Sequence, residues 1–277
     1  MITLLFLRFS ARHAIGFSPG MTNTSTGWKS FLEEAGGLSH FAGRFFAEVF
    51  RPRYELKEFV RQSYFVGYKS AGLVAITAFI IGLVITMQSR PTLVEFGAEA
   101  WLPQMVSVSL VREIVPVITG LICAGKIGSG IGAELGSMKV TDQIDAMEVS
   151  GTNPFKYLVV TRVMATTLMI PLLVVLGNAV ALYGSYLGAN MYGGLSWNLY
   201  WTQVFDSLTY SDVFPAFIKT FFFGFAIGVV GCYKGYSSPK GTEGVGQSAN
   251  AAVVVASLIV FILDLMAVQI TGMLGFN

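Results

Sequence analysis

Long apolar runs alternate with short polar stretches along this chain. A membrane-spanning helix needs about 20 mostly apolar residues, and five segments of the sequence meet that length. Helices are the expected form, because lipid cannot satisfy free backbone N–H and C=O groups. The pattern therefore predicts an all-α polytopic membrane protein with one integral domain over residues 36–277. The spans are expected at about 66–88, 103–125, 157–182, 213–233 and 250–275.

The region before the first span has a different pattern. Apolar residues recur at helical spacing over about 38–64, with charged residues off that stripe. This predicts an amphipathic helix lying in the plane of the membrane interface, although a helix packed on a soluble partner has the same pattern. Residues 1–35 contain a short apolar run without a small-residue cleavage site. We expect a poorly ordered leader there rather than a signal peptide.

Composition agrees with a membrane protein. Hydrophobic residues make up 53% of the chain and charged residues 12%, whereas soluble domains carry about 25% charged residues. The mean hydropathy is +0.63. The two cysteines, Cys123 and Cys232, are too few for a disulfide framework.

The distribution of Lys and Arg predicts the orientation of the chain in the membrane. The region up to Lys69 holds nine of them, and the loops after the second and fourth spans hold several more. On the opposite side there is Arg90, and the segment 183–212 has none. The N-terminus and the two lysine-bearing loops are therefore expected in the cytoplasm, and the C-terminus outside it.

In the half of the membrane away from the cytoplasm, three of the expected spans carry charged residues: Arg112 and Glu113 in the second, Lys219 in the fourth and Asp264 in the fifth. A charge at bilayer depth costs about 2.5–3.5 kcal/mol on insertion scales. With the orientation above, all four residues fall in the outer half of the membrane, and their charges sum to zero. One interpretation is a pocket that binds a phospholipid headgroup, with the planar Arg112 fork on phosphate. The other is a structural network of ion pairs.

Small residues follow at intervals of four within and after the second span. Ala124, Gly128, Gly132 and Gly136 would lie on one helix face, where small side chains allow close helix packing. The stretch "GLICAGKI" (120–127) superficially matches a phosphate-binding loop. However, it lacks the Ser or Thr that holds Mg²⁺ and does not follow a strand. With no constellation typical of a catalytic or metal site, we expect no cofactor, no enzymatic activity and no nucleic-acid partner.

A short helix is predicted between the second and third spans, over about 138–152. Thr141 is expected to cap its start and Gly151 to end it. Apolar and acidic positions alternate along it, which is typical of a docking element and equally of an ordinary connecting helix. The residues expected to contact a partner there are Lys139, Asp142, Ile144, Asp145, Met147 and Glu148.

The run "LVREIVPVITGLICAGKIGSGIGAELGSMKVTDQIDAMEVSGTNPFKYLVVTRV" resembles the signature region of the MlaE (YrbE) family. The likeness covers most of 40–277 and includes "FGFAIGVVGCYKGY" and "LDLMAVQITGMLGFN". Members are permease subunits of ABC transporters that move phospholipids between bacterial membranes.

The resemblance implies a homodimer in the bacterial inner membrane. It also implies a cytoplasmic ATPase that binds each copy through residues 138–152, a STAS-type protein in some members, and an MCE-domain protein on the periplasmic side. ATP hydrolysis would then take place in a partner subunit, with phospholipid as the substrate. Two other classes remain open: a membrane scaffold, which would not need intramembrane charges, and a lipid-modifying enzyme, which would need a nucleophile or metal.

Overall fold

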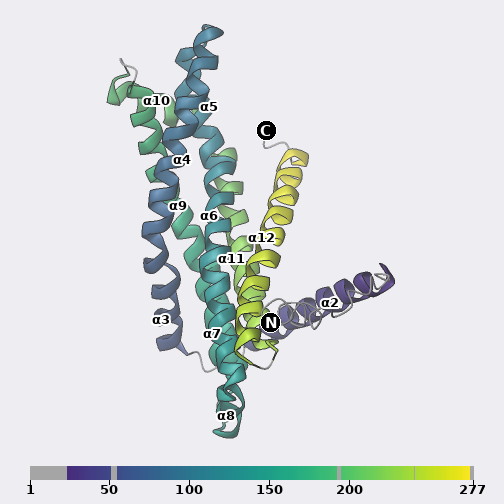
Figure 1. Ribbon diagram of the computed structural model, residues 1–277. Coiled ribbons are helices and arrows are strands. Elements are labelled where there is room, and N and C mark those ends of the chain that lie inside the picture. The colour runs from purple at the N-terminus through teal and green to yellow at the C-terminus, as the bar shows by residue number, and fades with distance from the viewer. Residues whose placement is uncertain (1–23, 51–54, 192–194, 240, 275–277) are drawn as a thin grey trace, which may run out of the picture. The chain divides into compact units, whose positions relative to one another are not determined.

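The computed structural model describes residues 24–50, 55–191, 195–239 and 241–274 (Figure 1). The chain divides into two units, Met1–His40 and Phe41–Asn277. The described part of the first unit is the start of helix α2 (Thr24–Val49). Most of the expected leader over 1–35 thus lies outside the described residues, and its end belongs to α2. The all-α prediction is confirmed, since no strand occurs among the described residues.

Five helical stretches are long and apolar enough to cross a membrane, as predicted: Leu56–Glu95, Glu99–Val140, Phe155–Asn190, Tyr210–Tyr236 and Thr242–Met273. The first consists of α3 (Leu56–Val66) and α4 (Tyr68–Glu95). The second consists of η1 (Glu99–Trp101), α5 (Leu102–Ser109), η2 (Leu110–Ile114), α6 (Val115–Cys123), η3 (Ala124–Gly128) and α7 (Ser129–Val140). The others are η4 (Phe155–Val160) with α9 (Thr161–Asn190), α11 (Tyr210–Tyr236) and α12 (Thr242–Met273). The connecting helices are α8 (Gln143–Val149) and α10 (Trp197–Ser207).

The expected interfacial helix over 38–64 is divided in the structure. Helix α2 ends at Val49 and α3 begins at Leu56. Gly67 then has helical torsion angles, φ −74° and ψ −72°, so α3 continues in line into α4 (Figure 1). The second half of the expected helix is therefore an extension of the first span. In α3 the face buried against neighbouring helices consists of Glu58, Gln62 and Val66, whereas the apolar side chains of Leu56 and Val60 are exposed.

The second stretch contains two π-helical turns, η2 and η3. At η2 the N–H of Val115 donates to the carbonyl of Leu110, five residues back. Pro116 follows directly, and proline has no N–H to offer the carbonyl four residues before it. A wider turn accommodates that missing hydrogen bond. Arg112 and Glu113 lie inside η2 itself, and π turns occur frequently at functional sites.

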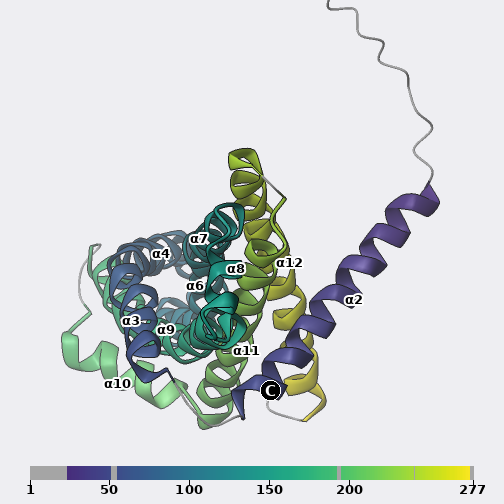
Figure 2. The same ribbon diagram turned by 90° about the horizontal axis from the view of Figure 1, so that it is seen from below.

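Small residues let α4 and α9 approach closely. Every fourth residue of α3 and α4 from Glu58 to Thr86 is buried. A Cβ atom on Gly82 would overlap the backbone carbonyl of Ala181, and one on Gly184 would overlap that of Phe79. Close backbone contact of this kind is typical of helix packing in membranes. Figure 2 views the helices from below. In this view α4, α6, α7 and α9 form one group, and α11 and α12 lie along one side of it.

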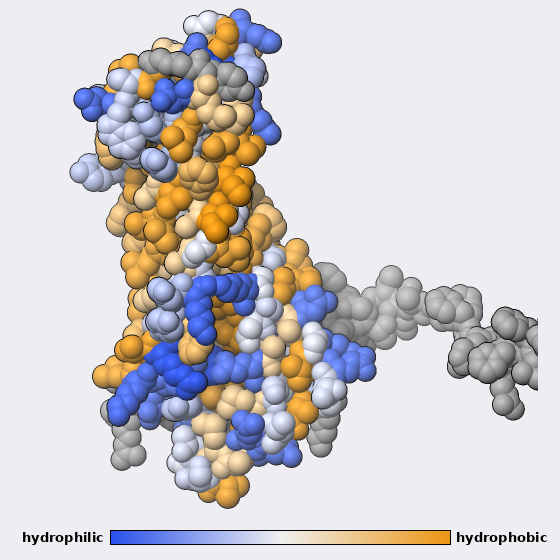
Figure 3. All heavy atoms as spheres, turned by 60° about the vertical axis from the view of Figure 1, so that its left-hand side comes forward, coloured by the Kyte–Doolittle hydropathy of each residue, from blue (hydrophilic) through white to orange (hydrophobic). Residues whose placement is uncertain are grey.

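The surface in Figure 3 has an apolar band between two more hydrophilic ends. This is the distribution expected for helices that cross a lipid bilayer. The part of α2 that belongs to the second unit packs against η4. The Phe41 and Phe155 ring centroids are 5.0 Å apart, and Arg44 lies 4.2 Å over the Phe155 ring.

Candidate functional site

An ion cluster lies between η2, α11 and α12. The Lys219 ammonium donates to Glu113 Oε2 at 2.6 Å and to Asp264 Oδ1 at 2.8 Å. Lys219 is 5% exposed, while the side chains of Glu113 and Asp264 are 36% and 18% exposed. The structure thus brings together three of the four charges that the sequence places inside the spans.

Arg112, the fourth, points to a partner that the sequence analysis missed. Its Nη1 lies 3.6 Å from Asp212 Oδ1. Asp212 also completes a capping box at the start of α11, where its Oδ2 accepts from the Thr209 N–H at 3.1 Å and from the Thr209 hydroxyl at 2.6 Å. The Thr-x-x-Asp spacing was a usable signal for this cap, but it lies just outside the expected span. The Arg112 side chain is 30% exposed, so it is accessible from the surface of the site.

An apolar groove adjoins the ion cluster. It has a volume of about 650 Å³ and lies between α11 and α12, which diverge toward the C-terminal end of α12 (Figure 1). Phe214, Ile218 and Phe222 line it from α11, and Leu263, Met266 and Ile270 line it from α12. Lys219 belongs to its wall as well. By contrast, the cavity enclosed among the charges themselves measures only about 10 Å³.

This geometry suits an amphipathic ligand. The groove has the size of many small-molecule sites, about 300–1,000 Å³, which are mostly apolar with a few polar groups that fix orientation. A polar headgroup has no room inside the ion cluster, so it would contact the exposed parts of the Arg112 and Glu113 side chains. Apolar chains would occupy the groove. Within the described residues no group of three His, Cys, Asp or Glu side chains is placed to hold a metal ion.

The small residues of η3 and α7 lie against α11 and α12 or the turn between them. A Cβ atom on Gly132 would lie 3.3 Å from Ala252 Cβ, and one on Gly136 would lie 3.3 Å from Ser238 Oγ. Gly128 faces Ile227, with room to spare at 3.7 Å. Ala124 is fully buried. These contacts tie the helix that carries Arg112 to both walls of the groove.

Helix α8 projects from the end of the bundle (Figure 1). The expectation that Thr141 caps it is wrong, since the Thr141 hydroxyl donates to the Ser137 carbonyl at 2.8 Å and so belongs to the end of α7. Asp142 stands at the cap with φ 55° and makes no side-chain cap bond. At the other end Gly151 has φ 81°. The N–H groups of Gly151 and Thr152 donate to the carbonyls of Glu148 and Met147, as in a Schellman motif.

The two apolar residues of α8 that were expected to meet a partner differ in the structure. Ile144 is 1% exposed and packs on its own chain, so it is not available to a partner. Met147 is half-buried. Val149 is 91% exposed and is the apolar side chain that α8 presents outward. Lys139 donates to Asp145 Oδ1 at 2.9 Å across the turn before α8.

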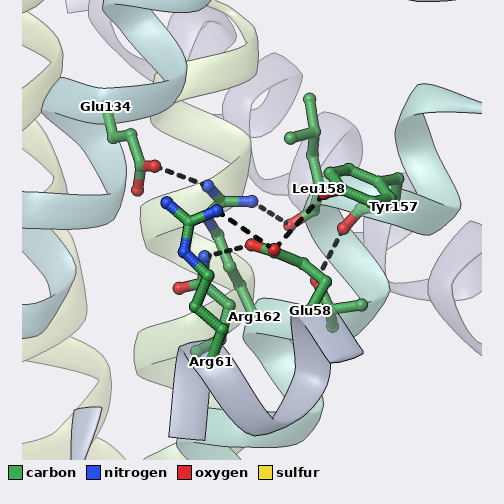
Figure 4. A network of polar contacts seen from close by, with 8 residues as sticks. Glu58, Arg61, Glu134, Tyr157, Leu158 and Arg162 are labelled. Carbon is green, nitrogen blue, oxygen red and sulfur yellow. Dashed lines mark hydrogen bonds and ion pairs between the residues drawn. The ribbon is translucent and has the colours of Figure 1, made fainter. Parts of the chain in front are cut away.

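A second polar network at this end of the bundle was also missed (Figure 4). Arg162 is 2% exposed; its Nη2 lies 2.8 Å from Glu134 Oε1, and its Nη1 donates to the Leu158 carbonyl at 2.9 Å. Glu58 accepts from Tyr157 at 3.3 Å and lies 3.4 Å from Arg61. Arg162 stands six residues inside the expected third span, so the argument applied to Arg112 would have found it.

Comparison with known proteins identifies similar chains. A family model described as "Permease MlaE" matches residues 59–270. A probable ABC transporter permease protein of Rickettsia felis is 37% identical over 232 residues, which cover 84% of this chain and 90% of that protein. One of Synechocystis is 34% identical and covers 79% and 84%. The intermembrane phospholipid transport system permease protein MlaE of Haemophilus influenzae is 33% identical over 206 residues and covers 74% and 79%.

Proposed function

This chain belongs to the MlaE permease family of ABC transporters, and from that premise we propose that it moves phospholipids between the inner and outer membranes. The observation that carries the proposal is the apolar groove with Lys219 in its wall, next to Arg112 and Glu113. The phosphate of a lipid would meet the exposed side chain of Arg112, since a guanidinium can bind two oxygens at once. The acyl chains would lie between α11 and α12. The name of the Haemophilus relative supports a phospholipid as the substrate.

The proposal includes partners. We infer a homodimer in the inner membrane, a cytoplasmic ATPase bound at α8, and an MCE-domain protein at the opposite end. A STAS-type protein is a further partner by family resemblance. Alternation of the groove between open and closed forms would then be driven from α8 through the continuous helix Glu99–Val140.

The decisive experiment is purification of the chain from its native membrane under mild conditions. We expect an ATPase and an MCE-domain protein to co-purify, with phospholipid detected by mass spectrometry. A scaffold would retain the cytoplasmic proteins without stoichiometric lipid. A lipid-modifying enzyme would convert added phospholipid without any ATPase present.

Arg112→Lys tests the headgroup contact. Lysine keeps the charge but loses the planar fork. One hydrogen bond to a charged group contributes about 1.5–3 kcal/mol, so we expect co-purified phospholipid and transport to fall about tenfold or more. Arg90→Lys is the matched control. Arg90 donates from two nitrogens to Glu99 outside the groove, as Arg112 is proposed to do to the lipid phosphate. Wild-type lipid content in Arg112→Lys would favour the purely structural network.

Glu148→Lys with Val149→Asp tests docking at α8. Both side chains are exposed, so the exchange should leave the fold intact and abolish recovery of the ATPase in a pull-down. Glu243→Lys is the control, because Glu243 is an exposed carboxylate in α12, outside α8. Full ATPase recovery with the double variant would exclude this surface as the docking site.

Cysteine labelling tests the orientation. Asn198 in α10 and Glu243 in α12 are both exposed, and the Lys and Arg distribution predicts that they lie on opposite sides of the membrane. A membrane-impermeant maleimide added to spheroplasts should label Asn198→Cys and spare Glu243→Cys. The native thiols of Cys123 and Cys232 are buried and need no replacement in the folded protein. Labelling of both positions from outside would contradict the topology.

A further inference from the structure

A second cavity lies at the opposite end of the second span from the ion cluster. It has a volume of about 260 Å³ and lies where α3 and α4 meet η3 and α7. Three basic side chains line it: Arg61, Lys69 and Lys126. Lys126 is 14 residues beyond Arg112 along the same helix, which corresponds to roughly 21 Å at 1.5 Å per residue. The two sites are therefore separate.

The positive charge in this cavity is poorly compensated. Within the described residues, no carboxylate lies within 4 Å of the Lys69 or Lys126 ammonium. Lys126 donates instead to the Lys69 carbonyl, and the Lys69 ammonium lies 3.8 Å over the Phe65 ring. Each contact leaves most of the ammonium's hydrogen-bonding capacity unused, since an ammonium has three donors.

The nearby carboxylates have partners of their own. Glu134, which also lines the cavity, lies 2.8 Å from Arg162, as Figure 4 shows. Glu58 contacts Arg61 at 3.4 Å and also accepts from Gln62 at 2.6 Å. The Arg61 side chain is 63% exposed and lines the cavity while it contacts Glu58. An anion would therefore meet excess positive charge.

A buried hydroxyl in the same wall lacks a partner. Ser70 is 1% exposed and lines the cavity, and its Oγ has no hydrogen-bond partner among the described residues. Buried polar groups are nearly always hydrogen-bonded, so an unpaired one calls for a ligand or water. Lys69 lines the same cavity. A phosphate oxygen could accept from both residues.

We infer that this cavity binds the phosphate group of a phospholipid in the cytoplasmic leaflet. The lipid source is favoured over free phosphate because Phe65, Ile127 and Ile131 form an apolar part of the wall. The outer face of α4 above it carries exposed apolar residues such as Ile76 and Ile80, along which acyl chains can lie. This inference does not depend on the transport function proposed above. A phospholipid bound in this cavity could be a permanent structural ligand even if the chain moved no lipid.

Native mass spectrometry of the purified full chain tests this inference, with phosphatidylglycerol as the titrated probe. We expect Lys69→Gln with Lys126→Gln to weaken binding at one site at least about tenfold, as loss of charged hydrogen bonds implies. Ser70→Ala should weaken it several-fold. Lys57→Gln, at an exposed position that does not line the cavity, should stay within about twofold of wild type, because solvent screens an exposed charge.

Two measurements separate the alternatives. Without lipid, Ser70→Ala should unfold at the same or a higher temperature than wild type, because it removes an unpaired buried hydroxyl; weaker lipid binding then cannot be blamed on misfolding. Arg112→Lys should leave this site unchanged, which distinguishes it from the groove. Unchanged lipid binding in the double variant and in Ser70→Ala would overturn the inference. Inorganic phosphate that stabilises the chain alone and displaces the lipid would assign the cavity to a soluble anion instead.

Discussion

Replacing Lys219 with alanine is expected to destabilise the protein by about 3 kcal/mol or more. Removal of one partner of a buried ion pair typically costs about 3–5 kcal/mol, because the remaining charge is left uncompensated. Here two carboxylates, Glu113 and Asp264, would lose the same ammonium. The lower end of the range applies because the Glu113 side chain is 36% exposed and partly solvated.

The effect should be visible as a lower unfolding midpoint in detergent and as loss of bound phospholipid. Lys219→Arg keeps the charge and should retain most of the stability. Lys57→Ala removes an exposed lysine in the first turn of α3, away from the ion cluster, and serves as the control. If Lys219→Ala unfolded at the wild-type midpoint, the three-residue cluster would not hold the helices together.

Gly82→Val is expected to separate α4 from α9. The added side chain would overlap the backbone carbonyl of Ala181, which cannot turn aside as a side chain can. Overpacking typically costs about 1–3 kcal/mol and sometimes more, and a backbone obstacle places this variant at the upper end. A lower yield of folded protein and a lower unfolding midpoint should follow.

The same helix provides the matched control for this substitution. Gly72 also lies in α4, and a Cβ atom there would meet nothing within 4 Å. Gly72→Val should therefore leave the midpoint close to that of wild type, or raise it slightly by replacing a helical glycine. Equal losses in the two variants would mean that the damage comes from β-branching in the helix and not from the contact with Ala181.

The five spans could be predicted because each is a long apolar run whose length matches the membrane. The sequence could not show where each helix stops once it leaves the lipid. Helix α3 carries charged residues and reads as a separate segment, yet Gly67 adopts helical torsion angles and joins it to α4. A glycine at position 67 can either end a helix or continue it. The packing of the neighbouring helices therefore determines that α3 and α4 are joined.

The candidate site was predictable in part for a related reason. Glu113, Lys219 and Asp264 could be placed together because charges buried in lipid have to find partners. The Arg112–Asp212 contact depends on how α11 begins, and Asp212 reads from the sequence as a helix cap only. Ile144 shows the same limit at α8: an apolar stripe indicates that one face is covered, but it does not say whether the chain itself or a partner covers it.

The two π turns in the second stretch give it a mechanical property. Each turn inserts one extra residue into the helix, which rotates all that follows by about 100°. Passage of such an insertion along the helix, by exchange of single hydrogen bonds, would turn one segment against the other without unfolding either. The turns contain Arg112 and Glu113 in one case and Lys126 in the other. Rotation that begins at α8 would therefore reorient charged side chains at two depths of the membrane. The stretch Glu99–Val140 would transmit that rotation, since no loop interrupts it.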